Sequence, residues 1–190
     1  MADGDLFGLM EAPVPATNLL FALMAYPTHE AALAAQDRGS TYQADKGRGG
    51  NLFPTDRMHV TLGKFEVKER VENFVERVSR AITSLKLTSF EIVFDQIGGF
   101  SSGNVVLQGQ EGLEPLRALQ AALRGALAWE KLEKGLPRTY TPHMTVIYGQ
   151  PGEEVAAIKP VRWIVREIVL VISHQGESRH EILVRFPLIG

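Results

Sequence analysis

Two short stretches of the chain indicate both its fold and its chemistry: Met58-His59-Val60-Thr61-Leu62 and Pro142-His143-Met144-Thr145-Val146. Each has the pattern x-His-apolar-Thr-apolar, and such alternation of polar and apolar residues is typical of a half-buried β-strand. The two copies lie far apart in the chain and form a faint internal repeat. The repeat predicts two similar lobes that face each other, each with one motif-bearing strand.

The residue types in these strands suit phosphoryl chemistry. Because side chains alternate between the two faces of a strand, His59 and Thr61 share one face, and His143 and Thr145 share another. Cleaving a phosphodiester requires a base for the attacking oxygen and an acid for the departing one, and histidine can serve as either near neutral pH. Threonine hydroxyls can donate hydrogen bonds to the phosphoryl oxygens. The pattern therefore predicts a metal-independent phosphoesterase.

Two other uses of the histidines compete with this one. The pair could satisfy hydrogen bonds of the core, or it could bind a metal. The motifs add no carboxylate or cysteine at ligand spacing, and Asp56 precedes the first strand without clear geometry, so we expect no metal and no cofactor. The other three histidines have no repeated context and are expected to be solvated or capping: His29, His174 and His180.

Composition narrows the class of protein. The 190 residues, 45% of them hydrophobic, favour one compact domain. The net charge of −2 lacks the basic surplus of a binder of long nucleic acid, which leaves a phosphorylated nucleotide or an RNA end as the expected partner. The chain has no cysteine, so disulfides and thiolate chemistry are excluded. With no membrane-length apolar run or secretory signal, we expect a cytoplasmic, monomeric protein.

The order of expected elements favours an α+β fold. Residues 1–17, which include Pro13 and Pro15, are expected to form a flexible extension before a single domain over 18–190. Strands are expected over 18–25, 58–65, 90–94, 105–107, 143–148, 163–172 and 181–186, the last two paired as a hairpin. Helices are expected over 28–37, with Thr28 as its N-cap and Gly39 ending it, and over 66–85 and 113–129. The late strands have too few helices between them for a doubly wound parallel sheet, so antiparallel sheets with helices outside are predicted.

From about residue 18 onward, the chain resembles the two-histidine phosphoesterase superfamily, in its bacterial 2′-5′ RNA ligase or RNA 2′,3′-cyclic phosphodiesterase branch. The resemblance is carried by residues 18–23, 58–65, 140–146, 167–171 and 185–188. It implies a bilobal fold of two pseudo-symmetric antiparallel sheets, with helices on the outer faces and both motifs facing a central groove. It also implies hydrolysis of 2′,3′-cyclic phosphates on RNA ends or nucleotides to 2′-phosphates. Two alternatives stay open: a 2′-5′ RNA ligase or phosphodiesterase, and a module that binds nucleotides or RNA ends without turnover.

The resemblance also implies roles for single residues. His59 and His143 become the acid–base pair, and Thr61 and Thr145 become phosphate ligands. The family often has an arginine after its second motif, whereas this chain has Ile147-Tyr148. Cations can neutralise phosphate and aromatic rings can stack on bases, although each such residue also has an ordinary structural explanation. On these grounds the further candidates for substrate contacts are Arg57, Lys64, Phe65, Tyr140 and Tyr148.

Overall fold

The computed structural model describes residues 20–47, 49–100, 103–149, 154–174 and 179–190. The extension expected over residues 1–17 lies outside the described residues. The strands of the described part are β1 (Leu20–Ala25), β2 (Asn51–Leu52), β3 (Val60–Glu66), β4 (Phe90–Gly99), β5 (Val105–Gln108), β6 (Met144–Tyr148), β7 (Ala156–Val165), β8 (Glu167–His174) and β9 (Arg179–Pro187). Its helices are α1 (His29–Lys46), α2 (Val71–Thr83) and α3 (Glu114–Trp129), with 3₁₀ turns η1 (Thr55–Arg57), η2 (Glu111–Leu113) and η3 (Glu133–Gly135).

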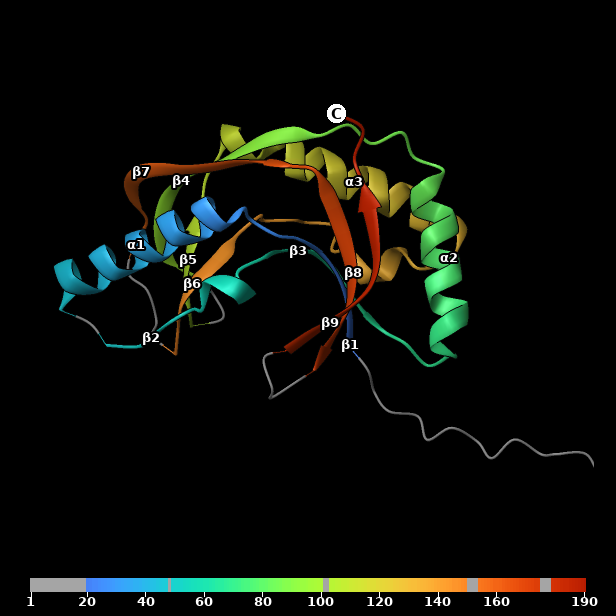
Figure 1. Ribbon diagram of the computed structural model, residues 1–190, viewed down its shortest axis with the longest axis horizontal. Helices are drawn as coiled ribbons and strands as arrows, with labels where there is room; N and C mark the ends of the chain where they lie inside the picture. Colours follow the sequence, from blue (N-terminus) through green and yellow to red (C-terminus); the bar gives the residue numbers. More distant parts are fainter. Residues whose placement is uncertain (1–19, 48, 101–102, 150–153, 175–178) are drawn as a thin grey trace, which may run out of the picture.

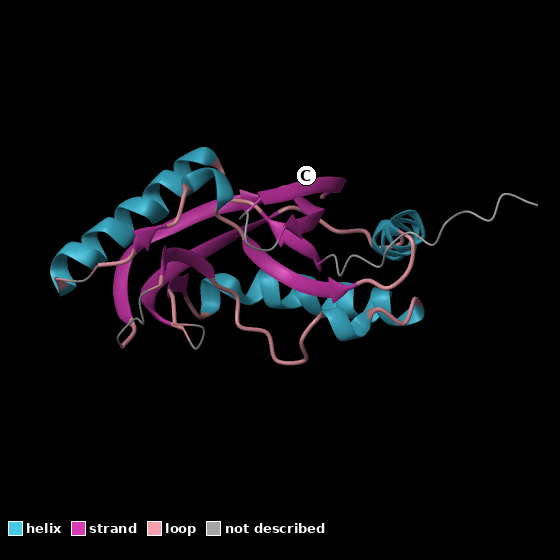
Figure 2. Ribbon diagram, turned by 90° about the horizontal axis from the view of Figure 1, so that it is seen from below, coloured by secondary structure: helices cyan, strands magenta, loops and turns pink. Residues whose placement is uncertain are grey.

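The strands form one antiparallel sheet in two halves. Its order is β7-β4-β5-β6-β3-β1-β8-β9, with β2 paired to β6. Between the halves, β3 and β6 are joined by the single register pair Val60 and Met144. The predicted α+β fold with antiparallel strands is confirmed, but the two expected sheets are the halves of one sheet, joined through this pair. Figure 2 shows the three helices at the periphery with the strands between them.

A second connection between the halves comes from β7 and β8. Val165 at the end of β7 pairs with Phe90 of β4, whereas Glu167 at the start of β8 pairs with Pro187 of β9. Only Arg166 separates the two strands, and Figure 1 shows β8 continuing from the end of β7, which runs along the top of the view. The single strand expected over 163–172 was therefore wrong, because the chain changes partners at Arg166. The halves are thus tied together in two places.

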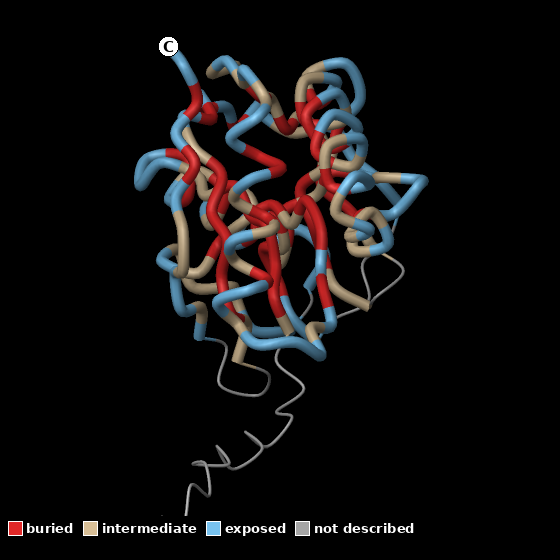
Figure 3. Tube along the Cα trace, turned by 90° about the vertical axis from the view of Figure 1, so that its right-hand side faces the viewer, coloured by how far each residue is buried: buried red, intermediate tan, exposed pale blue. Residues whose placement is uncertain are grey.

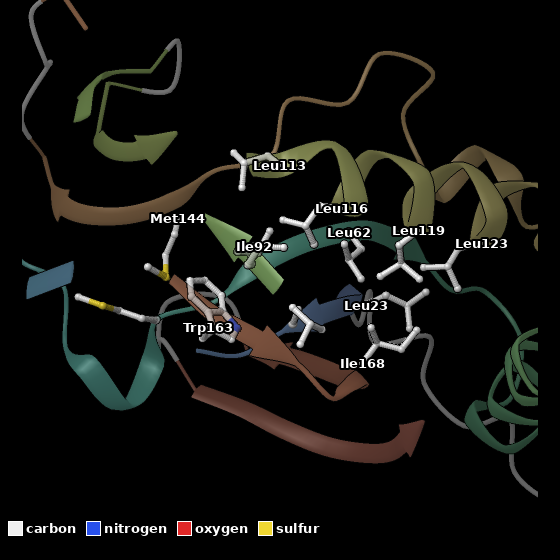
Figure 4. Close-up of a cluster of buried hydrophobic side chains, with 14 of the residues drawn as sticks. Leu23, Leu62, Ile92, Leu113, Leu116, Leu119, Leu123, Met144, Trp163 and Ile168 are labelled. Carbon is white, nitrogen blue, oxygen red and sulfur yellow. The ribbon is translucent and has the colours of Figure 1, made fainter. Parts of the chain in front are cut away.

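One hydrophobic core underlies both halves. Leu116, Leu119 and Leu123 of α3 recur at helical spacing, are buried, and face the same cluster as Leu23 of β1 and Ile168 of β8 (Figure 4). Burying each such side chain contributes roughly 1.5–3 kcal/mol. Figure 3 shows the buried segments gathered in the interior and the exposed ones at the edge. Residues from both halves share this core, which therefore fixes β3 against β6.

The first helix differs from its prediction. Thr28 caps it as expected, since its hydroxyl accepts a hydrogen bond from the backbone N–H of Ala31 at 3.2 Å. However, Gly39 does not end it: a Cβ there would lie 3.1 Å from Leu52 Cδ2, so this glycine permits close packing of α1 on β2. The helix ends instead at Gly47, whose φ of 58° is left-handed. No described helix is long and apolar enough to span a membrane.

Candidate active site

The junction of β3 and β6 brings the two sequence motifs together. Val60 and Met144, the residues that pair across it, are both buried in the core. His59 and Thr61 flank Val60 in the chain, and His143 and Thr145 flank Met144; unlike the two buried residues, all four are partly exposed. Because side chains alternate along a strand, the four motif side chains point to the opposite side from Val60 and Met144. All four motif side chains therefore lie together on the face that is turned away from the core.

The two histidines are held in the same way. Nδ1 of His59 lies 2.7 Å from the carbonyl oxygen of Arg57, and Nδ1 of His143 lies 2.9 Å from that of Thr141. In both cases the partner is the backbone two residues earlier. Because a carbonyl can only accept, each Nδ1 carries the proton and donates it, which leaves Nε2 free for other contacts. The duplicated motif therefore builds a duplicated imidazole geometry.

A groove of three adjoining hollows runs past this junction. The middle hollow, of about 210 Å³, is lined by His59, Lys64 and His180. The next, of about 330 Å³, is lined by Thr61, Lys64 and His143, so Lys64 belongs to both. A third hollow of about 560 Å³ lies on the other side of His180, and Arg57 lines it. His59 and His143 thus stand in neighbouring hollows with Lys64 between them.

A bulge in β3 brings Lys64 to this face. Leu23 pairs with Gly63 but Met24 pairs with Thr61, so Leu62 has no partner in β1 and the alternation of side chains shifts by one residue. Lys64 lies opposite Ala22, which belongs to the small apolar cluster on the groove side of β1. The shift also turns Phe65 into the core, where its ring packs 5.5 Å from that of Phe74. Phe65, a predicted substrate contact, was therefore placed on the wrong face.

Burial and neighbouring charges keep both imidazoles neutral. Burial lowers the pKa of His59 to about 4, the hydrogen bond to the Arg57 carbonyl opposes this shift, and charge on His180, Lys64 and His143 adds to it. Burial and the charge of Lys64 also lower the pKa of His143, against the opposing effect of its carbonyl partner. An anion bound in the groove would act in the opposite direction, raising both pKa values.

A third histidine stands beside the pair. The ring of His180 meets that of His59 edge to face, with centroids 4.8 Å apart, and its Nδ1 lies 3.0 Å from the hydroxyl of Tyr26. The expectation that His180 is simply solvated was wrong, because the β8–β9 hairpin folds it over the end of β1. His174 lines the middle hollow together with His59 and His180, and its Nε2 lies 3.2 Å from a carboxylate oxygen of Glu181. His29 is exposed at the start of α1, as expected.

The remaining candidates for substrate contacts are Arg57, Tyr148 and Tyr140, and they lie in different surroundings. Arg57 and Tyr148 line the groove, and Tyr148, 51% exposed, stacks on Phe53 with centroids 5.3 Å apart. The hydroxyl of Tyr140 donates to the backbone carbonyl of Thr61 at 3.0 Å, so this side chain ties β3 to the segment before β6. Tyr140 also lines the hollow of His143.

One aromatic neighbour of His143 was missed from the sequence. The ring of Phe100 stacks on that of His143, with centroids 4.2 Å apart and planes 26° apart. Phe100 directly follows β4 and has no motif context that could have revealed it. Among the described residues, no three His, Cys, Asp or Glu side chains form a group that could hold a metal ion.

Comparison with known proteins gives the family. A model of the 2′-5′ RNA ligase superfamily matches residues 31–177. The chain belongs to this superfamily. This confirms the resemblance to two-histidine phosphoesterases that the sequence motifs carry.

Solved structures show the same fold at low identity. E. coli LigT complexed with ATP is 18% identical, with a TM-score of 0.70 over 90% of this chain and 99% of that one. TT0787 of Thermus thermophilus is 19% identical, with a TM-score of 0.70 over 90% and 98%. The MHV ns2 PDE domain is 16% identical, with a TM-score of 0.51 over 77% and 97%. No curated protein matches the chain.

Proposed function

We propose that the chain is a metal-independent phosphodiesterase that hydrolyses 2′,3′-cyclic phosphate ends of RNA or nucleotides to 2′-phosphates. The observation that carries the proposal is the duplicated geometry at the junction of β3 and β6. There, two imidazoles are each held through Nδ1, and they directly precede Val60 and Met144, the one pair that joins the two strands. The proposed catalytic pair is His59 and His143, and the proposed phosphate ligands are Thr61 and Thr145.

The proposed reaction moves one proton through each histidine. Nε2 of one neutral imidazole accepts a proton from water as its oxygen attacks phosphorus, and the other, protonated imidazole donates its proton to O3′ as the P–O3′ bond breaks. The threonine hydroxyls donate hydrogen bonds to the non-bridging phosphoryl oxygens, and the ammonium group of Lys64 neutralises the negative charge on these oxygens. The product is a 2′-phosphate, and exchange with solvent restores the two protonation states.

The substrate class is supported by what a relative of the same fold binds. Structures of E. coli LigT were solved with phosphate and with 3′-AMP, at 18% and 19% identity to this chain. We propose that the groove of this chain binds the same class of ligand, a nucleotide phosphate. Arg57 and Tyr148 are proposed as further contacts, because both line hollows that adjoin the histidines.

The direct test is hydrolysis of a nucleoside 2′,3′-cyclic phosphate in the presence of EDTA. We expect turnover by the parent, release of the 2′-monoester, and a loss of about 10²–10⁴-fold in His59→Ala and in His143→Ala. His29→Ala is the matched control, since this histidine is exposed at the start of α1. Equal rates in the parent and the two groove variants would refute the two-histidine mechanism.

A second candidate is the cleavage or joining of a 2′-5′ phosphodiester, favoured by the description of the matching family. It uses the same histidines on a different bond, so a dinucleotide with a 2′-5′ linkage distinguishes the two reactions. Cleavage of this dinucleotide without opening of the cyclic phosphate would favour the second candidate. Stoichiometric binding of both substrates without any product would instead indicate a binding module.

A further inference from the structure

The third hollow of the groove supplies no group to the proposed proton transfers, although Arg57, a proposed substrate contact, lines it. With about 560 Å³ it is larger than the two that hold His59 and His143, and it lies between η1 and the hairpin of β8 and β9. Three arginines line it, Arg57, Arg179 and Arg185, together with two carboxylates, Asp56 and Glu167. Its lining is therefore net positive, in a chain whose total charge is −2.

The hollow continues directly from the histidines. Tyr26 and His180 line it, they contact each other at 3.0 Å, and the ring of His180 lies 4.8 Å from that of His59. The arginines act on the same two groups: the charge of Arg57 contributes to lowering the pKa of His180, after burial, and the charge of Arg185 opposes the rise that burial causes in the pKa of Tyr26. A ligand that passes His59 would therefore reach the arginines.

The side chains of the hollow suit a phosphate with an attached nucleoside. Guanidinium groups match the geometry of phosphate oxygens and can donate two hydrogen bonds at once. Glu167 forms an ion pair with Arg185, which fixes the guanidinium at the rim of the hollow. Ile182 is 45% exposed and offers an apolar surface against which a base or sugar can pack. Cations beside aromatic rings, here Tyr26 and His180, are typical of sites for single-stranded nucleic acid.

We propose that this hollow binds the phosphate on the 5′ side of the terminal nucleoside, so that the preferred substrate is the end of an RNA strand. The inference rests on the proposed function. A 2′,3′-cyclic phosphate can only stand at a 3′ end, so the rest of the strand leaves the terminal nucleoside through its 5′ oxygen. With the cyclic phosphate between His59 and His143, the next phosphate along the strand is the one that Arg179 and Arg185 would contact.

The test compares kcat/KM for a nucleoside 2′,3′-cyclic phosphate, its 5′-phosphorylated form, and a dinucleotide that ends in the same cyclic phosphate. We expect the two substrates with the extra phosphate to exceed the first by about tenfold or more, as one charge-assisted hydrogen bond would give. The advantage should fall toward onefold in Arg179→Gln and Arg185→Gln. It should persist in Arg162→Gln, which removes an exposed arginine from β7 in the other half of the sheet.

Salt gives an independent readout. Each additional phosphate contact on a single strand should steepen the fall of log kcat/KM against log salt concentration by about 0.7. We therefore expect a steeper slope for the dinucleotide than for the nucleoside cyclic phosphate, and equal slopes in Arg179→Gln.

The outcomes separate this inference from the proposed function. Equal kcat/KM for all three substrates, with both histidines still required, would overturn the phosphate subsite and leave the phosphodiesterase intact. If the parent turned over none of the substrates, the proposed function would fail, and dissociation constants of the three ligands would decide the subsite. A dinucleotide that binds no tighter than the nucleoside cyclic phosphate would then refute it.

Discussion

Replacing His59 with glutamine should make the protein less sensitive to acid. Burial and neighbouring charges lower the pKa of His59 to about 4 from its ordinary value of 6.5. The unfolded chain therefore takes up a proton first as the pH falls, so stability that is fully present above pH 6.5 is lost between pH 6.5 and pH 4. At about 1.4 kcal/mol per pH unit, the loss from this one residue reaches about 2 kcal/mol at about pH 5.

Urea unfolding at about pH 7 and about pH 5 measures this contribution. Between the two pH values, His59→Gln should lose about 2 kcal/mol less than the parent in its free energy of unfolding. Carboxylates titrate in both proteins, as do His143 and His180, whose pKa values burial also lowers, so these contributions largely cancel in the comparison. His29→Gln, which alters an exposed histidine, is the matched control. Identical pH profiles for the parent and His59→Gln would refute the buried, neutral state of His59.

Three further outcomes are expected. The pH profile of kcat/KM for the cyclic phosphate should be bell-shaped, with its maximum below pH 6.5. The reason is that the pKa values of both histidines are lowered in the free protein. A maximum above about pH 8 would contradict this. Phe100→Ala should expose the His143 ring, raise its pKa toward the ordinary value and move one limb of that profile to higher pH. Tyr140→Phe should cost about 1 kcal/mol in urea unfolding, as the hydrogen bond to the Thr61 carbonyl is lost; an unchanged midpoint would show that water replaces it.

The sequence predicted those parts of the fold that depend on local pattern. The two His-x-Thr stretches, the helix cap at Thr28 and the antiparallel hairpin at the C-terminal end all follow from side-chain alternation or turn chemistry. The errors arose where tertiary contacts decide. Gly39 stays helical because β2 packs against it, and the strand break at Arg166 reflects a change of partner that leaves no mark on hydrophobic alternation.

At the candidate site, too, local sequence pattern predicted some features, and tertiary contacts decided the others. Phe65 was expected at the groove because aromatic rings can stack on bases, and strict alternation from His59 would also put it on the face of Thr61. The unpaired Leu62 shifts the alternation, which turns Phe65 into the core and leaves Lys64, also a predicted contact, at the groove. A bulge depends on the register with β1, so it could not be inferred from the residues of β3 alone. His180 comes from a hairpin whose position against β1 is likewise a matter of tertiary structure.

Lys64 suggests how a groove with neutral histidines could perform acid–base chemistry. Its charge lowers the pKa values of both His59 and His143, so in the empty groove it disfavours the protonated imidazole that a general acid requires. A phosphate bound between the strands neutralises that charge and raises both pKa values. Protonation of the acid then accompanies binding of the anion. The same lysine that keeps the resting site uncharged would thus couple the arrival of substrate to the protonation state that the reaction needs.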